Sequence, residues 1–161
     1  MQHRARRPGS SAALRGFTLI EVMIVVIVVS VLAAIALPSF MQQIRASRRA
    51  EAVAQLALIQ QAQERWRAHQ PSYATALMTA NPADCDTEAE RITNSCLNIA
   101  APSSGRYTYA LSAVSATGYT LTATPQGNQN QDRSGGASCN PLTVTVVGGT
   151  PTNAPAACFR Q

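Results

Sequence analysis

The chain has 161 residues, 46% of them hydrophobic, and a formal net charge of +5. This length fits one globular domain with a core rather than two ordinary domains. The charge is uneven, because Arg4, Arg6, Arg7 and Arg15 all precede Gly16, where no acidic residue occurs. The rest of the chain carries nine arginines against eight acidic side chains, a net charge of +1, which gives no global support for nucleic-acid binding.

A hydrophobic segment follows this basic N-terminus. No residue from Val22 to Ile44 is charged, and about 20 residues of helix cross the apolar core of a bilayer. The segment therefore predicts a membrane helix, whose N-terminal end the arginines place on the cytoplasmic side. One alternative is a secretory signal peptide cut near the A-x-A-like run 34–36, which leaves Glu21 unexplained because a carboxylate beside hydrocarbon is costly. A second alternative is a simple signal anchor with Glu21 at the membrane interface.

The junction between the basic and apolar parts carries a specific motif. The run from Gly16 to Val26, GFTLIEVMIVV, resembles the class III signal of type IV prepilins. The resemblance implies that a membrane-embedded prepilin peptidase removes residues 1–16 as a leader, by a cut between Gly16 and Phe17, and methylates the new amine of Phe17. Gly16 suits such a cut because a residue without a Cβ permits close approach. Residues 17–44 are then retained as a transmembrane and filament-core helix.

Two residues within this helix have expected roles in assembly. Glu21 follows Phe17 by one helical turn on the same face, where the helix dipole and the free amine favour its carboxylate. In the family the equivalent glutamate is thought to meet the N-terminal amine of a neighbouring subunit, so we expect Glu21 to set the register between subunits. Pro38 matches a proline that the family keeps, and the loss of its backbone donor predicts a helix kink.

Beyond Pro38 the helix is expected to continue to about Trp66. Apolar residues recur there every three or four positions and predict one buried stripe, formed by Val53, Leu56, Ile59, Ala62 and Trp66. Arg45, Arg48 and Arg49 are interpreted as part of a solvated helix face rather than as a contact with phosphate or another subunit.

A loop region is predicted from His69 to about Ser104, because Pro71 disfavours helical geometry in the residue before it. It carries acidic side chains at alternate positions: Asp84, Asp86, Glu88 and Glu90. The ordered glycine and bidentate glutamate of an EF-hand loop are missing, so a disulfide-closed surface loop is favoured over a calcium site.

The last third of the chain predicts strands. Residues 106–114 and 119–124 form an expected hairpin around Thr117-Gly118, and Leu142 to Val147 forms a third strand. Residues 125–140, rich in Gly, Gln, Asn and Ser, are expected to be an exposed loop. The fold class is therefore α+β, with a long N-terminal helix packed on an antiparallel sheet. This order resembles the type IV pilin fold, with residues 45–161 as the globular head.

The four cysteines are Cys85, Cys96, Cys139 and Cys158. An even count in a chain with an export-like start favours disulfides, and the absence of C-x-x-C pairs argues against a zinc site. Three pairings are possible, and sequence order suggests Cys85 with Cys96 and Cys139 with Cys158. The segment bounded by the second pair is similar to the loop that pilins staple to the sheet and expose on the filament.

No nucleophile with a matching base, phosphate-binding glycine loop or metal constellation is recognisable, so neither an enzyme nor a cofactor is predicted. The resemblance implies a structural subunit of a type IV pilus, more specifically a minor pilin of the PilE-like kind. It would be a single-pass inner-membrane precursor and then part of an extracellular pilus serving twitching motility, adhesion or DNA uptake. Its implied partners are other pilin subunits, the prepilin peptidase and the inner-membrane assembly machinery.

Two alternatives remain for the function. A type II secretion pseudopilin shares the N-terminal signal, although the four cysteines argue against its major form. A DNA-uptake pilin that binds DNA directly would need a basic surface stripe, which the net charge of +1 does not indicate.

Overall fold

The computed structural model describes residues 16–78, 81–100 and 104–160. Residues 1–15, which make up nearly all of the expected leader, lie outside the described residues. The chain divides into two compact units, one ending at Ser39 and the other beginning at Phe40. Helix α1 (Leu19–Arg67) begins in the first unit and ends in the second.

The first unit is the apolar part of α1. Its large side chains are exposed on all sides of the helix, as at Ile24 and Val29, which are 56% and 57% exposed. Among the described residues, α1 is the one helix long and apolar enough to cross a membrane. A helix that is hydrophobic all round requires a membrane or neighbouring helices around it, because water does not solvate such a surface favourably.

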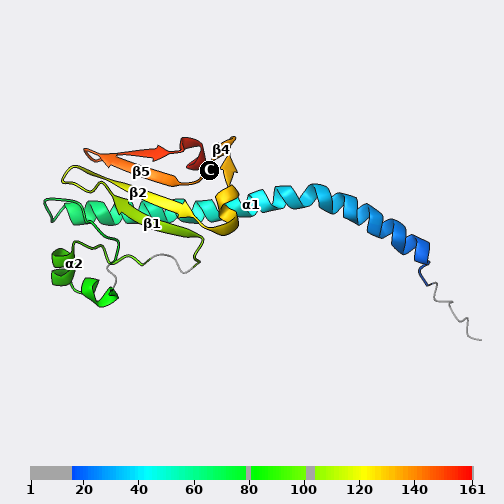
Figure 1. Ribbon diagram of the computed structural model, residues 1–161, viewed down its shortest axis with the longest axis horizontal. Coiled ribbons are helices and arrows are strands. Elements are labelled where there is room, and N and C mark those ends of the chain that lie inside the picture. Colours follow the sequence, from blue (N-terminus) through cyan, green and yellow to red (C-terminus); the bar gives the residue numbers. More distant parts are fainter. Residues whose placement is uncertain (1–15, 79–80, 101–103, 161) are drawn as a thin grey trace, which may run out of the picture. The chain divides into compact units, whose positions relative to one another are not determined.

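The second unit is an α+β head built on a four-stranded antiparallel sheet (Figure 1). The strands are β1 (Tyr107–Ser112), β2 (Gly118–Pro125), β5 (Leu142–Val147) and β6 (Thr150–Ala154), in the spatial order β1-β2-β5-β6. A separate small hairpin pairs β3 (Arg133–Ser134) with β4 (Ala137–Ser138). Figure 1 shows α2 (Glu88–Asn94) at the end of the head where α1 ends, and β4 at the opposite end.

The core lies between α1 and the sheet. Leu56 and Ile59 of α1 pack with Leu121 of β2 and Val144 of β5, and each of these side chains is at most 1% exposed. Burial of one such side chain contributes about 1.5–3 kcal/mol. Ala62 is also buried, and Val53 and Trp66 are partly buried against the same core. The predicted apolar stripe is therefore confirmed.

The predicted hairpin is confirmed as β1 and β2, with ends shifted by one or two residues, and the third strand is confirmed as β5 with the predicted ends. The fourth strand, β6, was not predicted. Its residues are all exposed, so it has no alternating pattern to read. The sequence did contain one signal for β6, the pair Gly148-Gly149. Both glycines have positive φ and form the two-residue hairpin turn that leads into β6.

The predicted loop over residues 69–104 is partly wrong, because it contains a 3-10 turn, η1 (Pro82–Cys85), and the helix α2. A capping box starts α2. Thr87 Oγ1 accepts from the Glu90 N–H at 3.3 Å, and a Glu90 carboxylate oxygen accepts from the Thr87 N–H at 3.0 Å. The hydrogen bonds that the Glu90 carboxylate accepts from Thr87, first from the backbone N–H and then from the hydroxyl at 2.8 Å, lower the pKa of Glu90. The alternating acidic residues thus belong in part to a helix start, where negative charge is favoured.

The expected exposed loop over residues 125–140 is also wrong in part. It contains η2 (Gly127–Gln131) and the β3–β4 hairpin, and it buries Gln129 and Asp132 to 1% exposure each. Polar composition predicted solvent exposure, but both side chains have hydrogen-bond partners elsewhere in the fold.

Candidate functional site

The start of α1 is shaped by Thr18. Its Oγ1 accepts from the backbone N–H of Glu21 at 3.3 Å, and its carbonyl accepts from the N–H of Val22 at 3.3 Å. Thr18 and Glu21 therefore occupy the N-cap and N3 positions of a helix start, the spacing of a capping box. The T-x-x-E spacing of these two residues was the signal in the sequence for this helix start, and it was not predicted. The helix begins two residues after the predicted cut, with Glu21 at its electropositive end.

The predicted processing and assembly residues lie together. Gly16, Phe17, Thr18 and Glu21 line one open hollow at the start of α1. Phe17 is 84% exposed, and Glu21 is exposed as well. The residue whose amine the predicted cut would release thus lies beside the carboxylate that is predicted to meet such an amine. Cleavage, methylation and the register role of Glu21 remain predictions, as does a kink at Pro38, which lies inside α1.

Arg49, which follows the hydrophobic segment, forms an ion pair with Asp132. Its Nη1 donates to both carboxylate oxygens of Asp132, at 2.7 and 2.8 Å. The Arg49 side chain is 11% exposed and that of Asp132 is 1% exposed. The expectation of a solvated face is therefore wrong for Arg49. The two residues are 83 positions apart, so sequence proximity could not have indicated the pair.

A second polar contact fastens η2 to α1. The buried Gln129 side chain donates from Nε2 to the Arg45 carbonyl at 2.9 Å and to the Tyr107 hydroxyl at 3.0 Å. Arg45 Nη2 in turn donates to Gln131 Oε1 at 2.7 Å. Together with the ion pair, these contacts place residues 129–132 beside residues 45–49 of α1.

The disulfides are Cys85–Cys96 and Cys139–Cys158, the pairing that sequence order suggests. They close loops of 11 and 19 residues, for which the chain-entropy model gives about 3 kcal/mol each. Cys139 follows the β3–β4 hairpin, and its Sγ lies 3.7 Å from Arg49 Nη1. The described residues contain no cluster of three or more His, Cys, Asp or Glu side chains suited to a metal ion.

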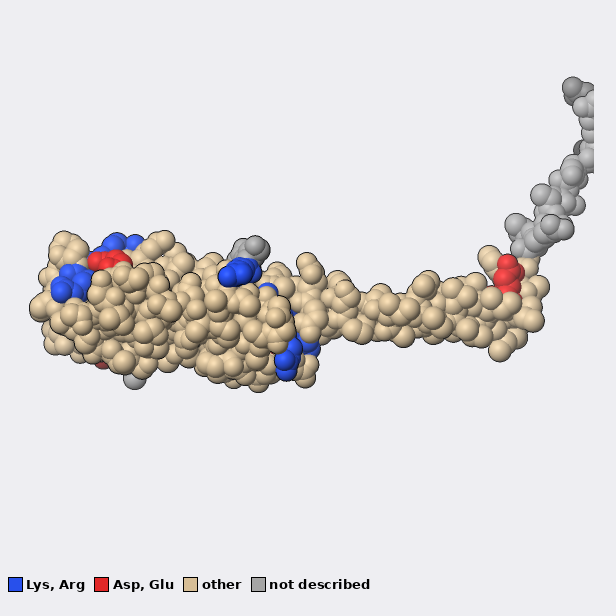
Figure 2. Space-filling model, turned by 90° about the horizontal axis from the view of Figure 1, so that it is seen from above, with Lys and Arg blue, Asp and Glu red and all other residues tan. Residues whose placement is uncertain are grey.

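Charge is segregated within the head. Four of its seven acidic residues lie in the η1–α2 segment: Asp84, Asp86, Glu88 and Glu90. Outside residues 81–100, the head from Arg45 onward has eight arginines against three acidic residues, an excess of five positive charges. Figure 2 shows arginine side chains at several places on one face of the head, with acidic ones at few. The net charge of +1 conceals this segregation.

A hydrophobic N-terminal helix that continues into an α+β head with an antiparallel sheet defines a membrane-anchored type IV pilin. Comparison with known families agrees: the prokaryotic N-terminal methylation motif matches residues 13–37. The family described as type IV minor pilin ComP, DNA uptake sequence receptor, matches residues 38–143. Because this match covers more than half of the chain, the chain belongs to the type IV minor pilins of the ComP family. No curated protein and no solved structure matches it.

The comparisons confirm two predictions from the sequence. The class III signal is confirmed by the methylation motif, whose match includes Gly16, Phe17 and Glu21. The minor-pilin reading is confirmed by the family match, which favours a pilus subunit over the secretion pseudopilin.

Proposed function

We propose that this minor pilin is cut between Gly16 and Phe17, methylated at Phe17 and assembled from the inner membrane into an extracellular pilus. The methylation-motif match over residues 13–37 is the observation that carries the proposal. The capped helix start at Thr18 supports it, because a cut after Gly16 leaves the capping contact intact. The prepilin peptidase and the inner-membrane assembly machinery are the partners for these steps, and other pilin subunits are the partners in the filament.

Burial of the apolar helix drives assembly in this proposal. The exposed apolar side chains from Phe17 to Met41 are stabilised when they are buried in the membrane and, after assembly, against neighbouring helices, because both environments exclude water. Glu21 would be costly in such a core unless an opposite charge pairs with it, and the methylated amine of a neighbouring Phe17 supplies that charge. Contacts between different surfaces of successive subunits form an open helical filament when the rotation does not close a ring.

The test compares processing with incorporation. Mass spectrometry of the mature N-terminus is expected to find methylated Phe17 in both the wild type and a Glu21→Ala variant. Pili sheared from cells are expected to contain the wild type but little Glu21→Ala, whereas a Glu51→Ala control in the head is incorporated normally. Wild-type amounts of Glu21→Ala in pili would exclude the register role. Antibody labelling confined to the periplasm in electron micrographs would contradict the pilus location.

We further propose that the head binds DNA during uptake. The family that matches residues 38–143 is described as a DNA uptake sequence receptor. The arginine excess outside residues 81–100 supports the same function, since phosphate neutralisation by cations dominates DNA affinity. Arg45, Arg48 and Arg133 are the proposed phosphate contacts, because residues 129–132, which directly precede Arg133, contact α1 and no described carboxylate pairs with these three.

A binding assay over a range of salt concentrations tests this second function. DNA affinity is expected to fall steeply with salt, and Arg48→Gln and Arg133→Gln are each expected to reduce the salt slope by about one. Arg106→Gln is the matched control, because Arg106 already lies 3.4 Å from the Glu51 carboxylate. DNA binding that is absent, or that is insensitive to salt and to these substitutions, would refute the role of the head in DNA binding.

A further inference from the structure

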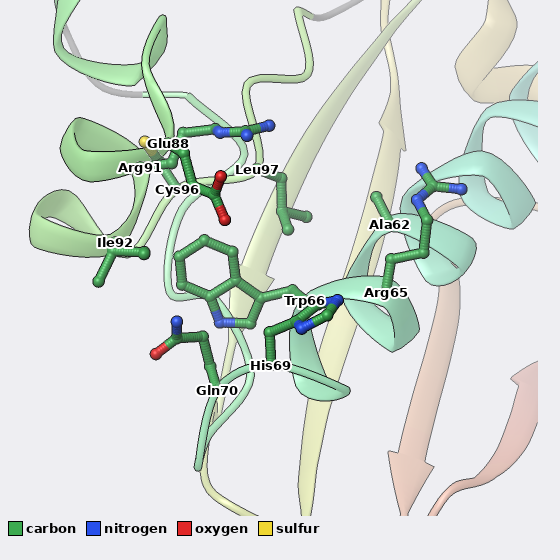
Figure 3. Close-up of a pocket in the computed structure, with 10 residues that line it drawn as sticks. All are labelled: Ala62, Arg65, Trp66, His69, Gln70, Glu88, Arg91, Ile92, Cys96 and Leu97. Atoms are coloured by element: carbon green, nitrogen blue, oxygen red, sulfur yellow. The ribbon is translucent and has the colours of Figure 1, made fainter.

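A pocket of about 200 Å³ lies between the end of α1 and helix α2 (Figure 3). It is separate from the proposed phosphate contacts, because Arg45 and Trp66 are 21 positions apart along α1, or about 32 Å of helix. The α2 side of the pocket is held in place by the Cys85–Cys96 disulfide and by the capping box at Thr87. The pocket is thus formed between two fixed helices.

Trp66, the single tryptophan of the chain, provides the aromatic surface of the pocket. Its indole Nε1–H donates to the Ser72 carbonyl at 3.1 Å, which fixes the orientation of the ring. Figure 3 shows the ring in the middle of the pocket, with the carboxylate of Glu88 pointing toward it. Because the indole N–H is already hydrogen-bonded, a ligand would contact the ring by stacking on one of its faces.

Two helices contribute unpaired cations to the pocket wall. Arg65 of α1 and Arg91 of α2 form no ion pair among the described residues. The Nε of Arg91 is buried and has no hydrogen-bond partner. An unpaired buried donor is uncommon in folded proteins, although this atom has less than 1 Å² of accessible surface and is not itself open to the pocket. The guanidinium of Arg91 extends along the top of the pocket in Figure 3.

We propose that this pocket binds one unpaired nucleobase, stacked on Trp66 and hydrogen-bonded at its edge by Arg91 and Glu88. Aromatic side chains and arginine are the groups by which proteins hold unpaired bases. Guanine fits this set best, because it offers O6 and N7 as acceptors to arginine and N–H donors to a carboxylate. The volume of about 200 Å³ is below that of pockets for drug-sized ligands, so one base fits better than two. This assignment rests on the proposed DNA binding for the source of the base.

The single tryptophan makes the experiment specific to the pocket. The full-length protein in detergent micelles is titrated with dGMP, with deoxyribose 5-phosphate and with a short single-stranded oligonucleotide, and Trp66 fluorescence is followed. Quenching is expected with dGMP and the oligonucleotide but not with the sugar phosphate. Arg91→Gln is expected to weaken the binding of dGMP roughly tenfold, since a good arginine–guanine pair discriminates by about that factor or more. Arg106→Gln is expected to leave the binding of dGMP unchanged, because Arg106 is absent from the lining of the pocket.

The outcomes separate this inference from the proposed function. If DNA shifts the protein in a gel but neither quenches Trp66 nor responds to Arg91→Gln, the pocket assignment is wrong and DNA binding stands. If dGMP quenches Trp66 but DNA is not retained, the pocket assignment stands and the uptake role is wrong. Equal quenching by dGMP and the sugar phosphate overturns the assignment of a base.

Discussion

The buried ion pair between Arg49 and Asp132 leads us to expect a large loss of stability when Asp132 is replaced by the isosteric asparagine. Asp132→Asn keeps the size of the side chain but leaves the Arg49 guanidinium, 11% exposed, without its counter-charge. Removal of one partner from a buried pair costs about 3–5 kcal/mol, and the residual exposure of Arg49 favours the lower end, about 3 kcal/mol. For a head of this size each kcal/mol lowers Tm by about 3–6 °C, so Tm is expected to fall by roughly 10–15 °C.

Thermal unfolding followed by circular dichroism in detergent micelles measures this effect. The control is Arg106→Gln, which breaks a pair whose side chains are 42% and 62% exposed and which is expected to change stability by less than about 0.5 kcal/mol. The double variant Arg49→Met/Asp132→Leu is expected to recover most of the loss, because it removes both charges together. An Asp132→Asn protein that unfolds at the wild-type temperature would refute the argument that this pair fastens η2 to α1.

Four further outcomes follow from the core and the disulfides. Tyr119→Phe is expected to stabilise the head by about 1 kcal/mol, because its buried hydroxyl has no hydrogen-bond partner, whereas Tyr107→Phe is expected to destabilise it by about as much through loss of the bond from Gln129. Burial raises the pKa of Tyr119 above its usual value of 10.0. The stability that depends on a neutral Tyr119 is therefore complete below pH 10 and is lost as the pH rises further. Alkaline unfolding of the wild type and of Tyr119→Phe would measure this loss. Gly118→Ala is expected to lower Tm, because an added Cβ would clash with the carbonyl of the neighbouring strand. Replacement of Cys139 and Cys158 by serine is expected to lower the free energy of unfolding by about 3 kcal/mol, measured by chemical denaturation. A reduced wild type as stable as the oxidised wild type would contradict this expectation.

Local patterns predicted the parts of this fold that depend on local physics. Helical spacing of Leu56, Ile59 and Ala62 predicted the buried stripe, and alternation predicted β1, β2 and β5. The strand β6 was missed because an exposed edge strand has no buried face to impose a pattern. Helix α2 was missed because its signal was a capping box and not a hydrophobic period.

The polar residues of the head behaved differently. Gln129 and Asp132 lie in a segment whose composition is typical of a solvated loop, and only their contacts with α1 explain their burial. The net charge of the head likewise does not show where the charges lie. It conceals that acidic residues are concentrated in the η1–α2 segment while arginines lie elsewhere.

The sequence by itself determined that this chain is a membrane-anchored pilin, because the motif from Gly16 to Val26 and the apolar helix are continuous in sequence and need no distant partner. Only the tertiary structure decided which arginines are paired and how Trp66 and Arg91 come to line one pocket. Those features join residues that are far apart in the chain, and the packing of the head alone brings them together.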